Sequence, residues 1–196
     1  MSGLLYRPDW EEARARLTAW WQGEDLGRPA MQITVRRETP WEEIPALPEP
    51  EGWVTHYSYR SLDYRVNLAR RACLHTQYLA EACPFAAPGD LGPGCVSLYL
   101  GCAGVEMPGT MWFEPCLTDP DTARIEIDRE NFYWQFTLAA HQATLPHSRG
   151  RFLQQFPDLI EGLDTLAALR DSQVLLTDLI ERPEWLDDPE FKTEPL

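Results

Sequence analysis

Two aspartates that follow a predicted strand are the first candidates for chemistry. Residues 151–156 alternate as a strand does, and Pro157 ends the pattern because proline has no N–H to donate to a ladder. Asp158 comes next, and Asp164 opens a predicted helix. Carboxylates in loops after strands serve (β/α) enzymes as acids or ligand contacts, since apolar walls favour the protonated form. We therefore predict both as catalytic residues; the structural alternative is a loop turn for Asp158 and a helix cap for Asp164.

Three further side chains lie at the ends of predicted strands. Glu114 precedes a proline at the end of a strand predicted over residues 111–115, and we predict that it contacts substrate. Arg36 and Arg37 follow a strand predicted over residues 30–35. Their guanidinium groups predict contact with an anionic substrate, although arginines after a strand are also common on protein surfaces.

Helical and strand patterns alternate along the chain, which predicts an α/β fold. Apolar spacing predicts helices over residues 8–22, 61–79 and 131–144, with one or two more between 164 and 183. The short apolar segment 95–101 is either a strand or a helix turn, and the helix is favoured because Pro93 and Gly94 precede it and Gly101 can cap it. Period-two alternation predicts strands near residues 30–35, 111–115, 125–127 and 151–156. In the first helix, the stripe that contains Trp20 and Trp21 is expected to be buried.

The composition excludes several classes of protein. The 17 basic and 31 acidic residues give a formal charge of 17 − 31 = −14, so we expect neither nucleic acid nor an anionic membrane as a partner. An apolar share of 44% is enough to build a core. No apolar run approaches the length of a membrane span, so a soluble protein is expected.

The five cysteines form no Cys-x-x-Cys pair and follow no secretory leader, which predicts a reducing, cytoplasmic location. Cys83 and Cys116 are the thiols to consider as nucleophiles. The sequence places no histidine to activate them, so we predict that both are buried, small apolar residues. His141 and His147 lack the partners of a metal site, and we predict no metal ligand among the candidate residues.

The order of several short motifs resembles the uroporphyrinogen-decarboxylase-like superfamily, which also holds the methylcobamide:coenzyme M methyltransferases. The motifs extend over almost the whole chain, and their spacing is more specific than any one of them. They are WW-G at 20–23, GRPAMQITV at 27–35, CPFAAPGDLGPG at 83–94, TMWFEP at 110–115, PDLIEGLDTLAALR at 157–170 and LLTDLIERPEW at 175–185.

The resemblance implies the N-terminal portion of a (β/α)8 TIM barrel, with parallel strands, long helices and a ligand site at the carboxyl ends of the strands. It implies that Asp90 contacts substrate, since relatives tend to carry an asparagine there. A full barrel of this kind needs about 250 residues, and the chain has 196. We therefore expect one domain over residues 1–196 that is truncated at its C-terminus, with exposed barrel edges through which the chain forms homo-oligomers.

The activities implied by the resemblance are tetrapyrrole decarboxylation, as in porphyrin metabolism, and corrinoid-linked methyl transfer. The arginine-rich substrate loop of the decarboxylases is missing near Arg36 and Arg37, which favours methyl transfer. The zinc ligands of the methyltransferases have no counterpart here, so zinc and a corrinoid are expected only in a full-length relative. The expected partners are a small-molecule substrate and a corrinoid protein. The alternative is a scaffold remnant or binding module without a complete active site.

Overall fold

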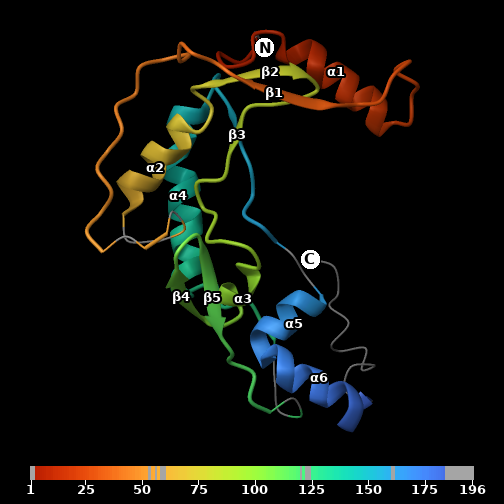
Figure 1. Cartoon of the computed structure of the whole chain (residues 1–196), viewed down its shortest axis with the longest axis vertical. Coiled ribbons are helices and arrows are strands. Elements are labelled where there is room, and N and C mark those ends of the chain that lie inside the picture. Colours follow the sequence, from red (N-terminus) through yellow and green to blue (C-terminus); the bar gives the residue numbers. More distant parts are fainter. Residues whose placement is uncertain are drawn as a thin grey trace. The chain divides into compact units, whose positions relative to one another are not determined.

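The computed structural model (Figure 1) describes residues 3–52, 54–55, 57, 61–119, 121, 125–159 and 162–183. The elements in chain order are α1 (Trp10–Trp21), β1 (Gln32–Arg36), α2 (Leu62–Arg71), β2 (Thr76–Ala80), β3 (Phe85–Ala86), α3 (Val96–Tyr99), β4 (Ala103–Met107), β5 (Thr110–Glu114), α4 (Phe132–Ser148), β6 (Leu153–Gln154), α5 (Leu163–Arg170) and α6 (Ser172–Glu181). None of the helices formed by these residues is long and apolar enough to cross a membrane. The predicted continuation of the family pattern after Pro183 lies outside the described residues.

The chain divides into two compact units, each built from separate stretches of sequence. Unit 1 contains Met1–Pro50, Ser61–Pro88 and Ala139–Gln155, and unit 2 contains Glu51–Arg60, Gly89–Leu138 and Phe156–Leu196. Helix α4 therefore gives its first half to unit 2 and its second half to unit 1. The expectation of one domain over residues 1–196 stays a prediction.

The strands pair into three sheets of two strands each. The strand pairs β1–β2 and β4–β5 are antiparallel, and β3–β6 is parallel. The predicted α/β content is confirmed, but the described residues form no closed barrel, and parallel pairing is wrong for two of the three sheets. In β4–β5 the reason is local, since Met107 pairs with Thr110 across a two-residue turn whose Gly109 has φ +79°.

Two predicted elements differ from the structure. The helix predicted over residues 61–79 ends at Arg71, and Thr76–Ala80 forms β2 instead. These five residues pair with β1, and the ladder satisfies their backbone N–H and C=O groups in place of helical hydrogen bonds. The strand predicted at 125–127 is absent, since these residues have no ladder partner.

The burial predicted for the first helix is right for Ala13 and wrong for Trp20 and Trp21. Helix α1 buries Ala13, while Trp20 and Trp21 are 48% and 82% exposed. Arg16 lies one turn after Ala13 and donates hydrogen bonds to the end of β2. A polar contact, rather than the tryptophan stripe, therefore sets which face of α1 meets the rest of unit 1.

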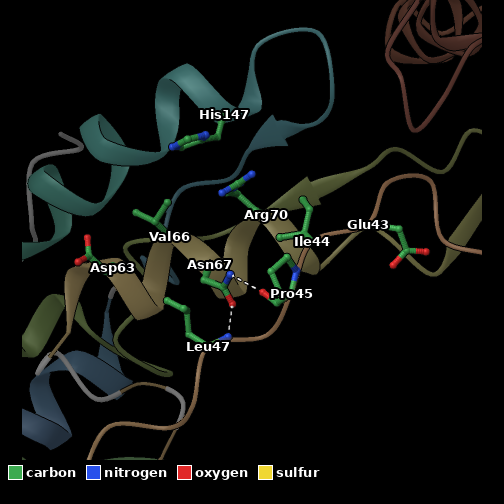
Figure 2. Close-up of a pocket in the computed structure, with 9 residues that line it drawn as sticks. All are labelled: Glu43, Ile44, Pro45, Leu47, Asp63, Val66, Asn67, Arg70 and His147. Carbon is green, nitrogen blue, oxygen red and sulfur yellow. Dashed lines mark hydrogen bonds between the residues drawn. The ribbon is translucent and has the colours of Figure 1, made fainter.

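The apolar core of unit 1 gathers around an aromatic pair. Tyr6 and Phe152 are stacked with ring centroids 6.1 Å apart. Around them lie the buried side chains of Ala69, Cys73, Leu74, Tyr78, Ala82 and Ala86. The Tyr6 hydroxyl donates to Glu42 at 2.7 Å, and Arg151 donates to the same carboxylate at 3.0 Å. Unit 1 also contains a pocket beside α2, drawn in Figure 2.

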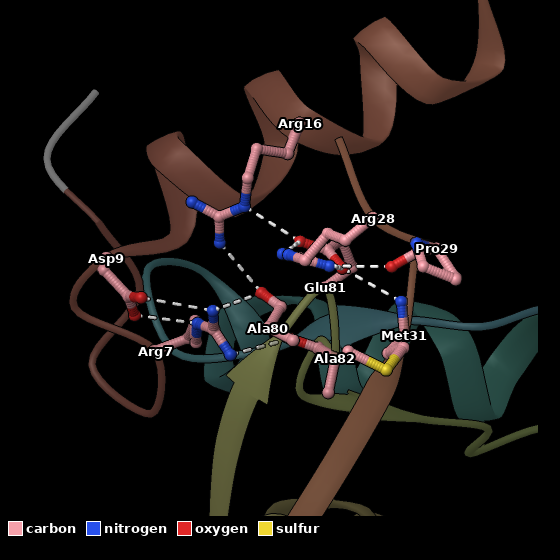
Figure 3. A network of polar contacts seen from close by, with 9 residues as sticks. All are labelled: Arg7, Asp9, Arg16, Arg28, Pro29, Met31, Ala80, Glu81 and Ala82. Atoms are coloured by element: carbon pink, nitrogen blue, oxygen red, sulfur yellow. Dashed lines mark hydrogen bonds and ion pairs between the residues drawn. The ribbon is translucent and has the colours of Figure 1, made fainter. Parts of the chain in front are cut away.

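A buried carboxylate joins three segments of unit 1 (Figure 3). Glu81 is 1% exposed and accepts hydrogen bonds from Arg28 at 2.6 Å and 2.8 Å, from Arg16 at 2.8 Å and from the Met31 N–H at 2.9 Å. Its own N–H donates to the Met31 carbonyl at 2.9 Å, which extends the β1–β2 ladder by one position. These hydrogen bonds, those from Arg28 above all, hold the pKa of Glu81 far below its usual range against the opposing effect of burial.

A buried cation completes the same region. Arg7 is 1% exposed, forms an ion pair with Asp9 at 2.7 Å, and donates to the carbonyls of Ala80 at 2.7 Å and Ala82 at 3.1 Å. Ala80 has φ +52°, a conformation that residues with a Cβ rarely adopt. Its carbonyl also accepts from Arg16 at 2.9 Å. The two arginines therefore stabilise the unusual backbone turn at which β2 ends.

Unit 2 has its own core and a pair of consecutive helices. Buried Leu91, Cys95, Leu98 and Tyr99 pack against aromatic side chains of β5 and α4. Between α5 and α6, Asp171 has φ +80°, and its carboxylate caps the N–H groups of Gln173 and Val174. Helix α6 is joined back to α5 by Asp178, a buried carboxylate that accepts from Arg170 at 2.7 Å.

Replacing Glu81 by Gln should destabilise the protein strongly. We expect a cost of about 2–3 kcal/mol in the free energy of unfolding, below the ~3–5 kcal/mol of a fully buried pair because both guanidinium groups are partly exposed. Urea unfolding at pH 7 measures this cost. The matched control is Glu11→Gln, which removes an exposed ion pair with Arg14 and should cost less than about 1 kcal/mol.

The same pair of variants tests the pH dependence. Because the folded-state pKa of Glu81 is depressed, its stabilisation is fully present above the unfolded-state pKa of about 4.3 and declines as the pH falls toward the folded-state pKa. The wild type should therefore approach Glu81→Gln in stability between pH 5 and pH 2, on the order of the range over which paired carboxylates titrate. A constant difference across that range would contradict the assigned contacts.

Candidate functional site

Two of the predicted site residues follow the parallel strand pair. In the register of β3 and β6, Ala86 pairs with Gln154. Asp90 comes four residues after Ala86, and Asp158 comes four residues after Gln154. One parallel pair is therefore present before these two aspartates in sequence, and their predicted roles stay predictions.

Both aspartates lie near one thiol in unit 2. The Cys95 Sγ donates to the Asp158 carbonyl oxygen over 3.1 Å. Burial raises the pKa of Cys95 to about 11, and the negative charges of Asp90 and Asp158 add to the rise. Asp90, predicted to bind substrate, and Asp158, predicted to be catalytic, therefore both lie near enough to Cys95 to influence its pKa. We call Asp90, Asp158 and Cys95 the Asp90–Asp158 site.

A buried chain of hydrogen bonds lies next to this site. The Tyr99 hydroxyl donates to the Thr137 hydroxyl at 2.9 Å, which donates to the Gly89 carbonyl at 3.0 Å. Tyr99 Oη also lies 3.6 Å from Cys95 Sγ, and its ring meets Trp134 edge-on with centroids 5.3 Å apart. Burial raises the pKa of Tyr99 well above its usual range. The hydroxyl therefore stays protonated and acts as a fixed donor.

The loop of Asp90 is fixed by its own backbone. The Asp90 carboxylate accepts from the Gly92 N–H at 3.0 Å, which closes a turn. Gly92 has φ +104°, which only glycine adopts without strain, and a Cβ there would lie 3.4 Å from the side chain of Met111. Leu91 between them is fully buried. Asp90 itself is half-buried on this loop.

The chemistry open to this site is that of carboxylates. Asp90 and Asp158 can accept hydrogen bonds from N–H or O–H groups of a ligand, or bind a cation. Cys95 is protonated near neutral pH, because its pKa is about 11, so the thiol is a weak donor and a poor nucleophile. The site is therefore suited to holding a ligand rather than to attacking it.

The other two acidic candidates, Asp164 and Glu114, are both exposed. Asp164 is exposed in the first turn of α5, whose cap residue is Gly162, and no side-chain cap bond is formed there. Glu114 is exposed at the end of β5, opposite Ala103. The roles predicted for these two carboxylates stay predictions.

The two arginine candidates belong to unit 1. Arg36 is exposed at the end of β1, opposite Thr76. Arg37 donates to Gln77 at 2.6 Å, and its guanidinium carbon lies 3.8 Å from the centre of the Trp41 ring. This stacking and hydrogen bonding fix Arg37 against its neighbours. Of the two, only Arg36 extends into solvent.

The predictions for cysteine and histidine need one correction. Cys116 was expected to be buried and is exposed, while Cys83 is half-buried. Cys116 follows Pro115 just after β5, where the chain leaves the sheet, and this explains the exposure. His141 is hydrogen-bonded to the Gln154 amide at 2.8 Å. Among the residues that the structure describes, no three histidine, cysteine or acidic side chains gather as metal ligands do.

A second candidate is the pocket of unit 1, which has a volume of about 380 Å³. Figure 2 shows Asp63, Asn67 and Arg70 along α2, facing the segment from Glu43 to Leu47. The Asn67 side chain joins the two walls, since it donates to the Pro45 carbonyl at 3.0 Å and accepts from the Leu47 N–H at 3.2 Å. Carboxylates, a guanidinium and the His147 imidazole share this lining with apolar groups.

Sequence reasoning missed both the polar chain under the Asp90–Asp158 site and this pocket. Each had a weak signal. Cys95 and Tyr99 are spaced i, i+4, and Asp63 and Arg70 are spaced i, i+7, so each pair lies on one face of a helix. What the sequence lacks is the partner from elsewhere in the chain, such as Thr137.

Asp90→Asn and Asp158→Asn should each lower the pKa of Cys95 from about 11, because each removes a negative charge near the thiol. The pKa should remain above the usual thiol value, since burial is the larger cause. Titration of ¹³C-labelled cysteine by NMR measures the effect. Asp164→Asn is the matched control and should leave Cys95 unchanged; equal titration curves in all variants would contradict the site.

Comparison of the sequence and the structure with known proteins found no match. No protein-family model matches the chain, and neither a curated protein nor a solved structure matches it. The functional argument therefore depends on the geometry of the residues described above.

Proposed function

We propose that the chain supplies the substrate-binding part of a uroporphyrinogen-decarboxylase-like enzyme, with Asp90 and Asp158 as ligand contacts. The observation that carries the proposal is the convergence of these two aspartates on Cys95 from loops that follow parallel strands. A barrel enzyme gathers its site residues in the same manner, at the carboxyl ends of parallel strands. The proposal includes a (β/α)8 arrangement, and the parallel β3–β6 pair supports it.

Within this family, the charge of the chain favours corrinoid-linked methyl transfer over tetrapyrrole decarboxylation. A porphyrinogen substrate is a polycarboxylate, which two aspartates and a net charge of −14 repel. A corrinoid carries amide side chains, whose N–H groups are donors for carboxylate acceptors. Zinc finds no set of three ligands among the described residues, so no step through zinc is assigned to them.

Calorimetric titration with methylcobalamin and with uroporphyrin tests the proposal. We expect methylcobalamin to bind and uroporphyrin to bind more weakly. Asp90→Asn and Asp158→Asn should each weaken methylcobalamin binding about tenfold or more, since hydrogen bonds to charged groups contribute about 1.5–3 kcal/mol. Asp164→Asn is the control and should bind as the wild type does. Equal affinity in all four proteins would contradict the proposed site.

The 196-residue chain should bind without turnover. We expect neither decarboxylation of uroporphyrinogen nor transfer of the methyl group from methylcobalamin to a thiol, because Cys95 is protonated and no metal ligand set among the described residues activates an acceptor. Product analysis by chromatography with the purified chain measures both reactions. Product formed in proportion to the amount of chain would contradict this expectation.

The pocket of unit 1 favours a second candidate function, a binding module for a small ligand with both acidic and basic groups. Its volume of about 380 Å³ lies in the range of small-molecule sites, and its lining includes Asp63 and Arg70. The same titrations separate the two functions. Binding that is lost in Arg70→Ala and retained in Asp90→Asn would favour this module over the proposed enzyme site.

A further inference from the structure

Two thiols of unit 2 lie in contact without being bonded. Cys102 Sγ and Cys116 Sγ are 3.6 Å apart, and both cysteines are free. Cys102 comes directly before β4, and Cys116 comes two residues after β5 ends. They therefore face each other at the open end of the β4–β5 hairpin, where the pairing of Ala103 with Glu114 is the last of the ladder.

The two thiols differ in access. Cys102 is 2% exposed, whereas Cys116 is exposed. An oxidant in solution therefore meets Cys116 first, and Cys102 is protected from it. Burial, together with the neighbouring Cys116, raises the pKa of Cys102 to about 12, so this thiol is mostly protonated near neutral pH. Its contact with the Cys116 sulfur, 3.6 Å away, is what suits it to react there. In redox-sensitive pairs, an accessible cysteine is oxidised first and a neighbouring, resolving cysteine then forms the disulfide. Cys116 and Cys102 fit these two roles.

The backbones of both residues are anchored. The Cys102 N–H donates to the Ser97 carbonyl at 3.0 Å, and the Cys116 N–H donates to the Leu169 carbonyl at 2.9 Å. A disulfide bond has a length of about 2.05 Å, so the two sulfurs must approach by roughly 1.5 Å. Rotation of the exposed Cys116 side chain can supply this approach. Since Leu169 belongs to α5, the bond would also fix the end of α5 to the base of the hairpin.

We propose that Cys102 and Cys116 form a reversible disulfide when the protein meets hydrogen peroxide. The Cys116 thiol is oxidised to a sulfenic acid, and the peroxide is reduced to water. The Cys102 sulfur then attacks the sulfenic sulfur, the S–O bond breaks, and the hydroxyl leaves with the Cys102 proton as a second water. Small thiols reverse the step by disulfide exchange, so the dithiol is the resting form in a reducing compartment. This device goes beyond the proposed ligand site and does not depend on it.

Peroxide treatment of the whole chain, followed by thiol counting after unfolding, tests the proposal. The count should fall from five to three in the wild type, 5 − 2 = 3, and return to five with dithiothreitol. Glu106 and Glu114 lie between the two cysteines. A glutamate-specific protease therefore separates their peptides, and only the oxidised protein should yield them joined.

Cys102→Ser and Cys116→Ser should each abolish the joined peptides, and Cys116 in Cys102→Ser should be trapped as a sulfenic acid by dimedone. Cys83→Ser is the matched control and should form the bond as the wild type does. Because Cys116 is exposed, its variant keeps the test valid if Cys102→Ser fails to fold. Oxidation of Cys116 to a sulfinic acid with Cys102 still free, or joined peptides only from dimers, would overturn the proposal.

Discussion

The arrangement of unit 1 depends on one buried carboxylate, Glu81. It joins α1, the segment before β1 and the end of β2, because Arg16, Arg28 and the Met31 N–H all donate to it. Placing a carboxylate inside a protein costs several kcal/mol unless its oxygens are paired, and here both oxygens have partners. The chain has a net charge of −14 and only 17 basic residues, and two of these, Arg16 and Arg28, neutralise this one carboxylate.

The same network stabilises the turn at the end of β2, within unit 1. Ala80 has φ +52°, a conformation that costs about 1–2 kcal/mol for a residue with a Cβ, and Arg7 and Arg16 offset this cost by donating to its carbonyl. Beyond this turn Ala82 enters the core, and the Pro84 carbonyl accepts from Leu153 at the start of the β3–β6 pair. In that pair Ala86 lies opposite Gln154, and Asp90 and Asp158 each follow four residues after these two partners.

Local patterns predicted what local interactions determine. Helices α1, α4, α5 and α6 were predicted from apolar spacing, and the strand before Asp158 from alternation. Helix α4 continues past its predicted end at residue 144 to Ser148, with Pro146 inside it. The sequence of β2 is also compatible with a helix, and only its pairing with β1, a partner forty residues away, makes it a strand. The burial of Trp20 and Trp21 was predicted wrongly for a related reason. Glu81 lies far from Arg16 in sequence, and the contact between them decides which face of α1 is buried. Of the six predicted site residues, Asp90 and Asp158 share one neighbourhood because β3 and β6 pair, and no spacing rule reveals that pairing.

Accessibility, more than residue type, separates the two kinds of chemistry that unit 2 offers. Cys95 lies next to two carboxylates and is buried, and both effects keep its proton in place, so the aspartates are the groups that a ligand would meet. Cys116 stands on the surface after Pro115 with a second sulfur 3.6 Å away, so it is the thiol that an oxidant would meet. A bond between Cys102 and Cys116 would act on the end of α5 through Leu169, whereas the Asp158 carbonyl accepts a hydrogen bond from Cys95, the residue just before α3. Ligand binding and thiol oxidation therefore use separate contacts, and a change in one carries no necessary change in the other.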